Sequence, residues 1–193
     1  MRIASTLALA VVIGLAGCAA KPSAGQATSA AAPAPAKATE SFFSRTKQAV
    51  ATLSPAAAGG ATGIVTFASS GGSAVDVHVV ATGLVPGSAH GFHVHEYASC
   101  ASADFASAGG HFNPTHQPHG PQDQPHHLGD MPGLWADQDG KIDARFTLQG
   151  VALGGSDGLV GHSVILHAAH DDFQTQPTGN SGARVACGAI TRR

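Results

Sequence analysis

The sequence predicts an antiparallel β sandwich or barrel that carries two long loops. Short apolar runs recur from about residue 48 onward, and several of them alternate apolar and polar residues with a period of two. Clusters of Gly, Ser and Pro separate these runs, and no long helical pattern appears between them. Several short strands with such punctuation are typical of an all-β domain, which we place at residues 48–193.

The expected strands follow one another with turn signals between them. They are residues 49–53, 63–67, 74–83, 91–96, 141–150, 161–168 and 184–190. Turn residues gather at 56–61, 69–73, 86–88 and 137–140. Two long tracts, 97–130 and 168–182, break the pattern, and tracts of this length inside a compact domain are usually functional.

The N-terminus has the features of a targeting segment. Arg2 is followed by an apolar stretch that is too short for a good membrane span and ends in Leu15-Ala16-Gly17-Cys18. Small residues before a cysteine resemble the lipobox of bacterial lipoproteins, so we expect a lipoprotein signal peptide at 1–17 and a lipid on Cys18. The alternative is an ordinary secretory peptide cleaved near Ala19-Ala20. Either reading places the mature protein outside the cytoplasm, in the periplasm or cell envelope, and the first attaches it to a membrane.

Residues 18–47 are rich in Ala, Pro, Ser and Thr, and we expect a flexible tether between the lipid and the domain. Cys100 and Cys187 remain once Cys18 is assigned to the anchor. Two cysteines in an oxidising compartment predict a disulfide.

Histidine is the unusual feature of the composition. Of 12 histidines, eight lie within residues 90–127, and dense histidine in a short tract indicates metal binding. The net charge of −2 gives no basic surface for nucleic acid. His78 and His90 read as outward-facing strand residues, and we assign them no role.

The stretch GFHVHE places His93 and His95 on one face of a strand, because successive strand side chains point to opposite faces. Alone, this pattern fits either a metal site or two surface histidines. Further donors follow at His111, His119, His127, Asp130 and His167. Seven donors serve two metals with four contacts each only if one donor bridges. The alternative is a loop that scavenges metal loosely, and the strand histidines count against it.

These residues resemble the copper/zinc superoxide dismutase family. GFHVHE, GGHFNP, the segment 119–130, VILHAAHDD and TGNSGARVACG are similar to its motifs and follow in the same order, over about residues 48–191. The resemblance implies an eight-stranded Greek-key β-barrel (an immunoglobulin-like sandwich). Its metal site lies outside the barrel, under two long functional loops.

The resemblance also implies one copper and one zinc per subunit. Copper would be bound by His93, His95, His167 and a bridging His111. Zinc would be bound by His111, His119, His127 and Asp130. His116, His126 and His170 are not ligands in this comparison, and His127 is preferred to His126 because it keeps the spacing HxGD.

Other matching positions imply supporting roles. Asp171 would link the rings of His93 and His119. Arg184 and Thr178 would form the walls of a channel to the copper, and Cys100–Cys187 would be the family disulfide. Residues 173–177 are a departure, because they are short and hold no Glu or Lys that could guide a substrate. His162 is another, since some members have arginine there.

The implied activity is dismutation of superoxide to oxygen and hydrogen peroxide by a redox-cycling copper, with a structural zinc and with Arg184 and His111 assisting. A homodimer is compatible with the resemblance. The alternative function is an extracytoplasmic copper- and zinc-handling protein without turnover. A zinc hydrolase is disfavoured, because HExxH is absent and the implied zinc site is closed by four protein ligands.

Overall fold

The computed structural model describes residues 47–193, and the expected signal peptide, Cys18 and nearly all of the expected tether lie outside the described residues. The strands are β1 (Gln48–Pro55), β2 (Thr62–Ser69), β3 (Ala74–Thr82), β4 (Ala89–His90), β5 (Phe92–His95), β6 (Leu134–Trp135), β7 (Ile142–Gln149), β8 (Ser163–His167), β9 (Arg184–Ala189) and β10 (Thr191–Arg192). A short 3₁₀ helix, η1, spans Ala106–Ala108. Within the described range, no helix is long and apolar enough to cross a membrane.

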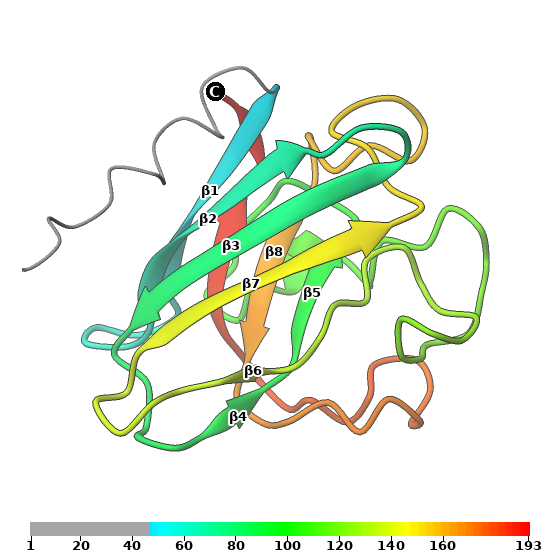
Figure 1. Cartoon of the computed structure of the whole chain (residues 1–193). Coiled ribbons are helices and arrows are strands. Elements are labelled where there is room, and N and C mark those ends of the chain that lie inside the picture. The colour runs from blue at the N-terminus through cyan, green and yellow to red at the C-terminus, as the bar shows by residue number, and fades with distance from the viewer. Residues whose placement is uncertain (1–46) are drawn as a thin grey trace, which may run out of the picture. The chain divides into compact units, whose positions relative to one another are not determined.

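The main sheet has eight strands and is antiparallel throughout. Its order is β5-β8-β9-β1-β2-β3-β7, and β10 pairs with β1 beside this path. β4 and β6 form a separate two-stranded sheet. β5 and β7 are the edge strands of the main sheet. Because β4 leads through Gly91 into β5 and β6 leads into β7, the pairing of β4 with β6 links these two edges. Figure 1 shows the resulting curled sheet, with β2, β3 and β7 in front of β5 and β8.

The core lies inside the curled sheet, as the period-two pattern predicts. Val75, Val77 and Val79 of β3 are buried, while His78 between them is partly exposed on the outer face. Ile142 and Leu148 of β7 and Phe67 of β2 complete this layer. The alternating strands therefore have one face in the core and one face toward solvent.

β5 differs from this pattern because every residue of it is buried. Phe92 and Val94 pack in the core, so His93 and His95 lie on the outer face. Their burial follows from the loop 97–130, which covers that face. Figure 1 shows this loop and the loop 168–183 running outside the sheet.

The structure confirms the all-β fold and the position of each expected strand. It adds three two-residue strands, β4, β6 and β10, which are too short to have a periodic pattern of their own.

Candidate metal centre

The free edge of β5 brings the loop 97–130 to the two strand histidines. Val94 donates its N–H to Gly129 O at 2.8 Å and accepts the N–H of Phe112 at 2.8 Å. These contacts place His111 opposite His95 and Asp130 opposite His93. A side chain at position 129 would collide with the carbonyl oxygen of Val94, so only glycine allows this approach.

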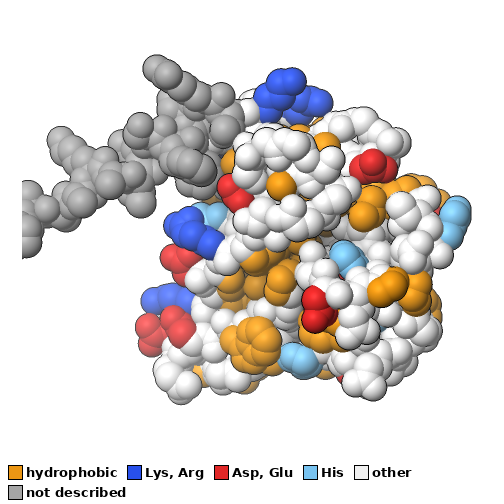
Figure 2. All heavy atoms as spheres, turned by 45° about the vertical axis from the view of Figure 1, so that its right-hand side comes forward, with side chains coloured by type: hydrophobic (Ala, Val, Ile, Leu, Met, Phe, Trp, Pro, Cys, Tyr) orange, Lys and Arg blue, Asp and Glu red, His pale blue; other side chains and the backbone are white. Residues whose placement is uncertain are grey.

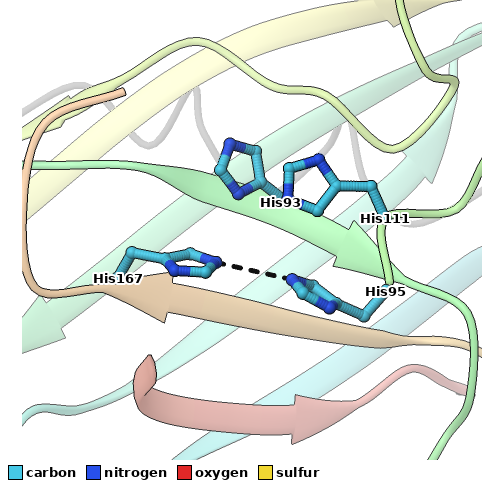
Figure 3. Close-up of side chains that lie close together, drawn as sticks. All are labelled: His93, His95, His111 and His167. Carbon is cyan, nitrogen blue, oxygen red and sulfur yellow. Dashed lines mark hydrogen bonds between the residues drawn. The ribbon is translucent and has the colours of Figure 1, made fainter. Parts of the chain in front are cut away.

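The first cluster consists of His93, His95, His111 and His167. One ring nitrogen from each lies within 4.8 Å of the others, and all four residues are buried. Figure 3 shows the rings converging from β5, β8 and the loop, with Nε2 of His167 3.4 Å from Nε2 of His95. Nδ1 of His93 and Nε2 of His111 are buried and have no hydrogen-bond partner within residues 47–193.

In each strand histidine of the first cluster, the ring nitrogen that points away from the centre of the cluster lies at hydrogen-bond distance from an oxygen atom. His95 Nδ1 lies 3.0 Å from Gly109 O, and His167 Nδ1 lies 3.2 Å from Gly182 O. His93 Nε2 lies 2.6 Å from Oδ2 of Asp171. Since a ring nitrogen must donate to these oxygens, the other nitrogen of each ring presents its lone pair to the centre of the cluster.

The second cluster consists of His111, His119, His127 and Asp130, again with donor atoms within 4.8 Å of one another. Nδ1 of the three histidines lies 2.8, 3.0 and 3.2 Å from Oδ1 of Asp130. The other oxygen of Asp130 accepts the backbone N–H groups of Gly120 and His127. His111 therefore belongs to both clusters, through Nδ1 here and Nε2 in the first.

The donor sets fit metal ions. Buried polar atoms without partners are unfavourable, and a cation at the centre of the first cluster would satisfy the unpaired nitrogens of His93 and His111. Four imidazoles suit copper, and three imidazoles with one carboxylate suit a four-coordinate zinc.

The charges are arranged for metal binding. Burial lowers the pKa of His95 to about 2, of His167 to about 3 and of His111 to about 4, which keeps these rings in the neutral form that metals bind. Burial alone would raise the pKa of Asp130, yet hydrogen bonds from three histidines hold it well below its usual range. Hydrogen bonds to Asp130 and Asp171 outweigh burial at His119 and raise its pKa to about 9, so this ring carries a proton at neutral pH that a metal ion must displace.

Asp171 contacts both clusters, in the place that the resemblance implies. Its Oδ2 accepts from His93 and its Oδ1 lies 2.9 Å from Nε2 of His119, with the carboxylate fully buried. A Cβ at Gly179 would overlap Asp171 and His119, so the loop backbone passes directly over this contact.

Arg184 is half-buried at the start of β9, and its guanidinium donates to Phe105 O at 2.6 Å and to Gly109 O at 2.7 Å. Both acceptors flank η1. The expected disulfide between Cys100 and Cys187 is present and ties the same loop to β9. Thr178 is exposed in the loop that carries Asp171.

The sequence predicts that His78 and His90 face outward, and the structure agrees for one of them. His78 is partly exposed and pairs with Asp143 at 2.8 Å, as an outward residue should. For His90 the interpretation is wrong, because its ring is buried and its Nδ1 donates to His167 O at 2.7 Å.

His162, which the sequence left without a role, joins the residue before β8 to the residue after β5. Its Nδ1 donates to Glu96 O at 2.7 Å, and its ring lies 4.0 Å from that of Phe112. Neither metal-binding cluster includes His116, His126 or His170.

Comparisons with known proteins agree with this geometry. The model of the copper/zinc superoxide dismutase family (SODC) matches residues 61–190. The superoxide dismutase-like protein YojM of Bacillus subtilis is 40% identical over 138 residues, which are 68% of this chain and 70% of that protein. The superoxide dismutase [Cu-Zn] of Deinococcus radiodurans is 39% identical over 146 residues, 68% of this chain and 78% of its own.

Solved structures show the same fold. A superoxide dismutase-like protein from Bacillus subtilis superposes with a TM-score of 0.67 at 36% identity, covering 72% of this chain and 96% of that chain. The clock protein EA4 superposes with a TM-score of 0.69 at 34% identity. The match covers 77% of this chain and 96% of the EA4 chain. A double mutant of a superoxide dismutase-like protein from Bacillus subtilis, in which a tyrosine and a proline become histidines, gives a TM-score of 0.65 at 38% identity. The match covers 74% of this chain and 96% of the mutant chain.

Proposed function

The chain belongs to the copper/zinc superoxide dismutase family, and from this premise we propose that it converts two superoxide anions and two protons to oxygen and hydrogen peroxide. The observation that carries the proposal is the pair of buried donor clusters sharing His111. A shared imidazole couples two metal ions, which neither a single structural site nor a loose metal-binding loop requires.

We assign one metal ion to each cluster. Copper would be held by His93, His95, His111 and His167. Zinc would be held by His111, His119, His127 and Asp130. The carboxylate supports the zinc assignment, because zinc favours a closed tetrahedral set of nitrogen and oxygen donors in structural sites.

Copper, when bound, supplies the one-electron couple that takes an electron from one superoxide and returns it to another. The protein groups bind the anion and handle protons. Arg184 has five N–H donors, and its two hydrogen bonds to carbonyl oxygens leave others for a small anion. Nε2 of His111 is buried and has no hydrogen-bond partner within residues 47–193. It would bind copper and, whenever copper does not occupy it, would hold the proton that passes to the peroxide.

Arg184 places positive charge beside the first cluster in a domain whose net charge is negative. Residues 48–193 hold five Lys and Arg against 11 Asp and Glu, so 5 − 11 = −6. On the face shown in Figure 2, the coloured basic side chains form no continuous patch. Attraction of superoxide therefore depends on charge close to the first cluster rather than on the whole surface.

A copper- and zinc-handling protein without turnover is the second candidate. It is favoured by the name of one relative, which says superoxide dismutase-like. The complete donor set here and the fixed position of Arg184 favour the enzyme, because metal storage needs no anion-binding group.

The test is stopped-flow superoxide decay on the purified protein, with metal content measured on the same sample. We expect fast decay that scales with copper occupancy, is lost on chelation and returns with copper. Background decay in protein that holds both metals stoichiometrically would favour metal handling instead.

We also propose that Cys18 carries a lipid that holds the protein at a membrane outside the cytoplasm. The motif Leu15-Ala16-Gly17-Cys18 supports it. Cys18→Ser should move the protein from the membrane fraction to the soluble fraction. Retention of the variant at the membrane would refute the anchor.

A further inference from the structure

The loop that follows Asp171 lies over the second cluster. Phe173 has a left-handed backbone with φ of 56°, an unfavourable conformation for an aromatic residue, and its N–H donates to Oδ1 of Asp171 at 2.7 Å. Its ring lies parallel to that of His119, with centroids 6.4 Å apart. Residues 173–177 hold no charged side chain that could guide a substrate anion.

Gln176 makes a two-point contact with the backbone of His119. Its Oε1 accepts the N–H of His119 at 2.8 Å, and its Nε2 donates to the carbonyl oxygen of the same residue at 2.8 Å. The two ring nitrogens of His119 face Asp130 and Asp171. All four polar groups of His119 are therefore held, two of them by one side chain that is 57 residues away in sequence.

Most of the hydrogen bonds that order the loop do not involve the Gln176 side chain, which adds one long contact from its Nε2 to Gln174 O at 3.4 Å. Asp172 accepts hydrogen bonds from the N–H of Gln174, from the N–H of Thr175 and from the hydroxyl of Thr175. Gly179 donates to Thr175 O at 2.7 Å, and Asp172 donates to Gly179 O at 2.9 Å. A side chain presented by a closed turn loses less conformational entropy on binding than one on a free segment.

We infer that Gln176 is a positioning residue for zinc retention, and that the loop 171–179 clamps the second cluster through the backbone of His119. The inference rests on the proposed function, because it requires zinc in that cluster. The Gln176 side chain acts on the second cluster only, because it contacts His119, while His95 and His167 are held by the carbonyl oxygens of Gly109 and Gly182. Asp171, at the start of the loop, also contacts the first cluster through His93.

The test compares Gln176→Ala with Gln174→Ala in the full-length protein loaded with one equivalent each of Cu²⁺ and Zn²⁺. Gln174 is the matched control, since it is an exposed glutamine in the same turn whose side chain makes no hydrogen bond within the described range. Zinc transfer to a chromophoric chelator is followed by absorbance, and retained copper is measured on the same sample by mass spectrometry.

We expect Gln176→Ala to release zinc about tenfold faster, at the low end of the effect of losing a group that orients a metal ligand. Copper retention should be unchanged, and Gln174→Ala should behave as wild type. Equal acceleration of both metals, or an unchanged zinc rate, would overturn the inference while leaving the metal centre intact. Loss of native circular dichroism in Gln176→Ala would overturn it as well, because the side chain would then support the whole domain. Wild-type protein that holds no zinc would overturn both proposals.

Discussion

Arg184 and His95 donate to the same acceptor, the carbonyl oxygen of Gly109, at 2.7 and 3.0 Å. This shared oxygen fixes the guanidinium relative to the first cluster. The position of the charge is therefore a consequence of the loop around η1, which also supplies Phe105 O as the second acceptor.

Replacing Arg184 with alanine should lower kcat/KM for superoxide by about tenfold, within the usual range for electrostatic guidance. The rate should also depend less on ionic strength, because salt screens the attraction between the guanidinium and the anion. Stopped-flow decay at several salt concentrations measures both effects.

Arg145→Ala is the matched control. It removes the same charge from an exposed position on β7, at the other edge of the main sheet. Equal effects of the two substitutions would mean that net charge, rather than the position of Arg184, governs the rate.

The Cys100–Cys187 disulfide closes a loop with a sequence separation of 87 residues. Chain-entropy arguments give it about 4–5 kcal/mol of stability at 25 °C. We expect the double variant Cys100→Ser with Cys187→Ser to unfold at a clearly lower urea concentration and to show weaker superoxide turnover, since the Arg184 acceptors flank η1 in the same loop. An unchanged unfolding midpoint would show that packing alone holds this loop to β9.

The sequence predicts the elements of this centre better than it predicts the contacts between them. Strand periodicity alone places His93 and His95 on one face, because it is a local property. The approach of His111 and Asp130 to β5 depends on Gly129, whose requirement appears only when the loop backbone lies against Val94. The resemblance to the copper/zinc superoxide dismutase family implies this ligand set, whereas the amino-acid composition indicates only that a metal binds.

Gln176 and His90 were missed for a related reason. Each acts by hydrogen bonding to a backbone group far along the chain, 57 and 77 residues away. A side chain that binds a distant carbonyl leaves no spacing or periodicity in the sequence. Their roles follow only from the return of the loops to the sheet.

His111→Ala should abolish the coupling between the two metals. Its Nδ1 faces Asp130 and its Nε2 faces the first cluster, and among the described residues it is the one that belongs to both donor clusters. We expect a changed electron paramagnetic resonance spectrum of copper and weaker binding of zinc. The control is His116→Ala, an exposed histidine of the same loop. A variant that kept the wild-type copper spectrum would reject His111 as the shared ligand.

Asp171→Asn tests the link between the clusters. The carboxylate accepts from His93 and His119 at once, and an amide would turn an N–H toward one of them. Zinc affinity should fall by about 10- to 100-fold, measured by competition with a chelator. Asp139→Asn, at an exposed turn, serves as the control. Equal affinities of the two variants would mean that the histidine rings keep their orientation without Asp171.

The metal-free protein should be most stable near pH 6.5 and should lose stability on both sides. Burial lowers the pKa of His95, His111 and His167 to between about 2 and about 4, from 6.5 in the unfolded chain. Between these values the unfolded state binds more protons than the folded state, so acid favours unfolding, by up to about 1.4 kcal/mol per pH unit for each ring.

His119 acts in the opposite direction, since its pKa is raised to about 9. The stability that it contributes is fully present below pH 6.5 and is lost as the pH rises toward 9. Asp130 and Asp171 do not alter this maximum, because their lowered pKa values affect stability only as the pH falls toward and below 4. Urea unfolding of metal-free protein at pH 4.5, 6.5 and 8.5 measures the balance. A midpoint at pH 4.5 that equals the midpoint at pH 6.5 would mean that the three rings accept protons in the folded state, and that the first cluster is open to water when no metal is bound.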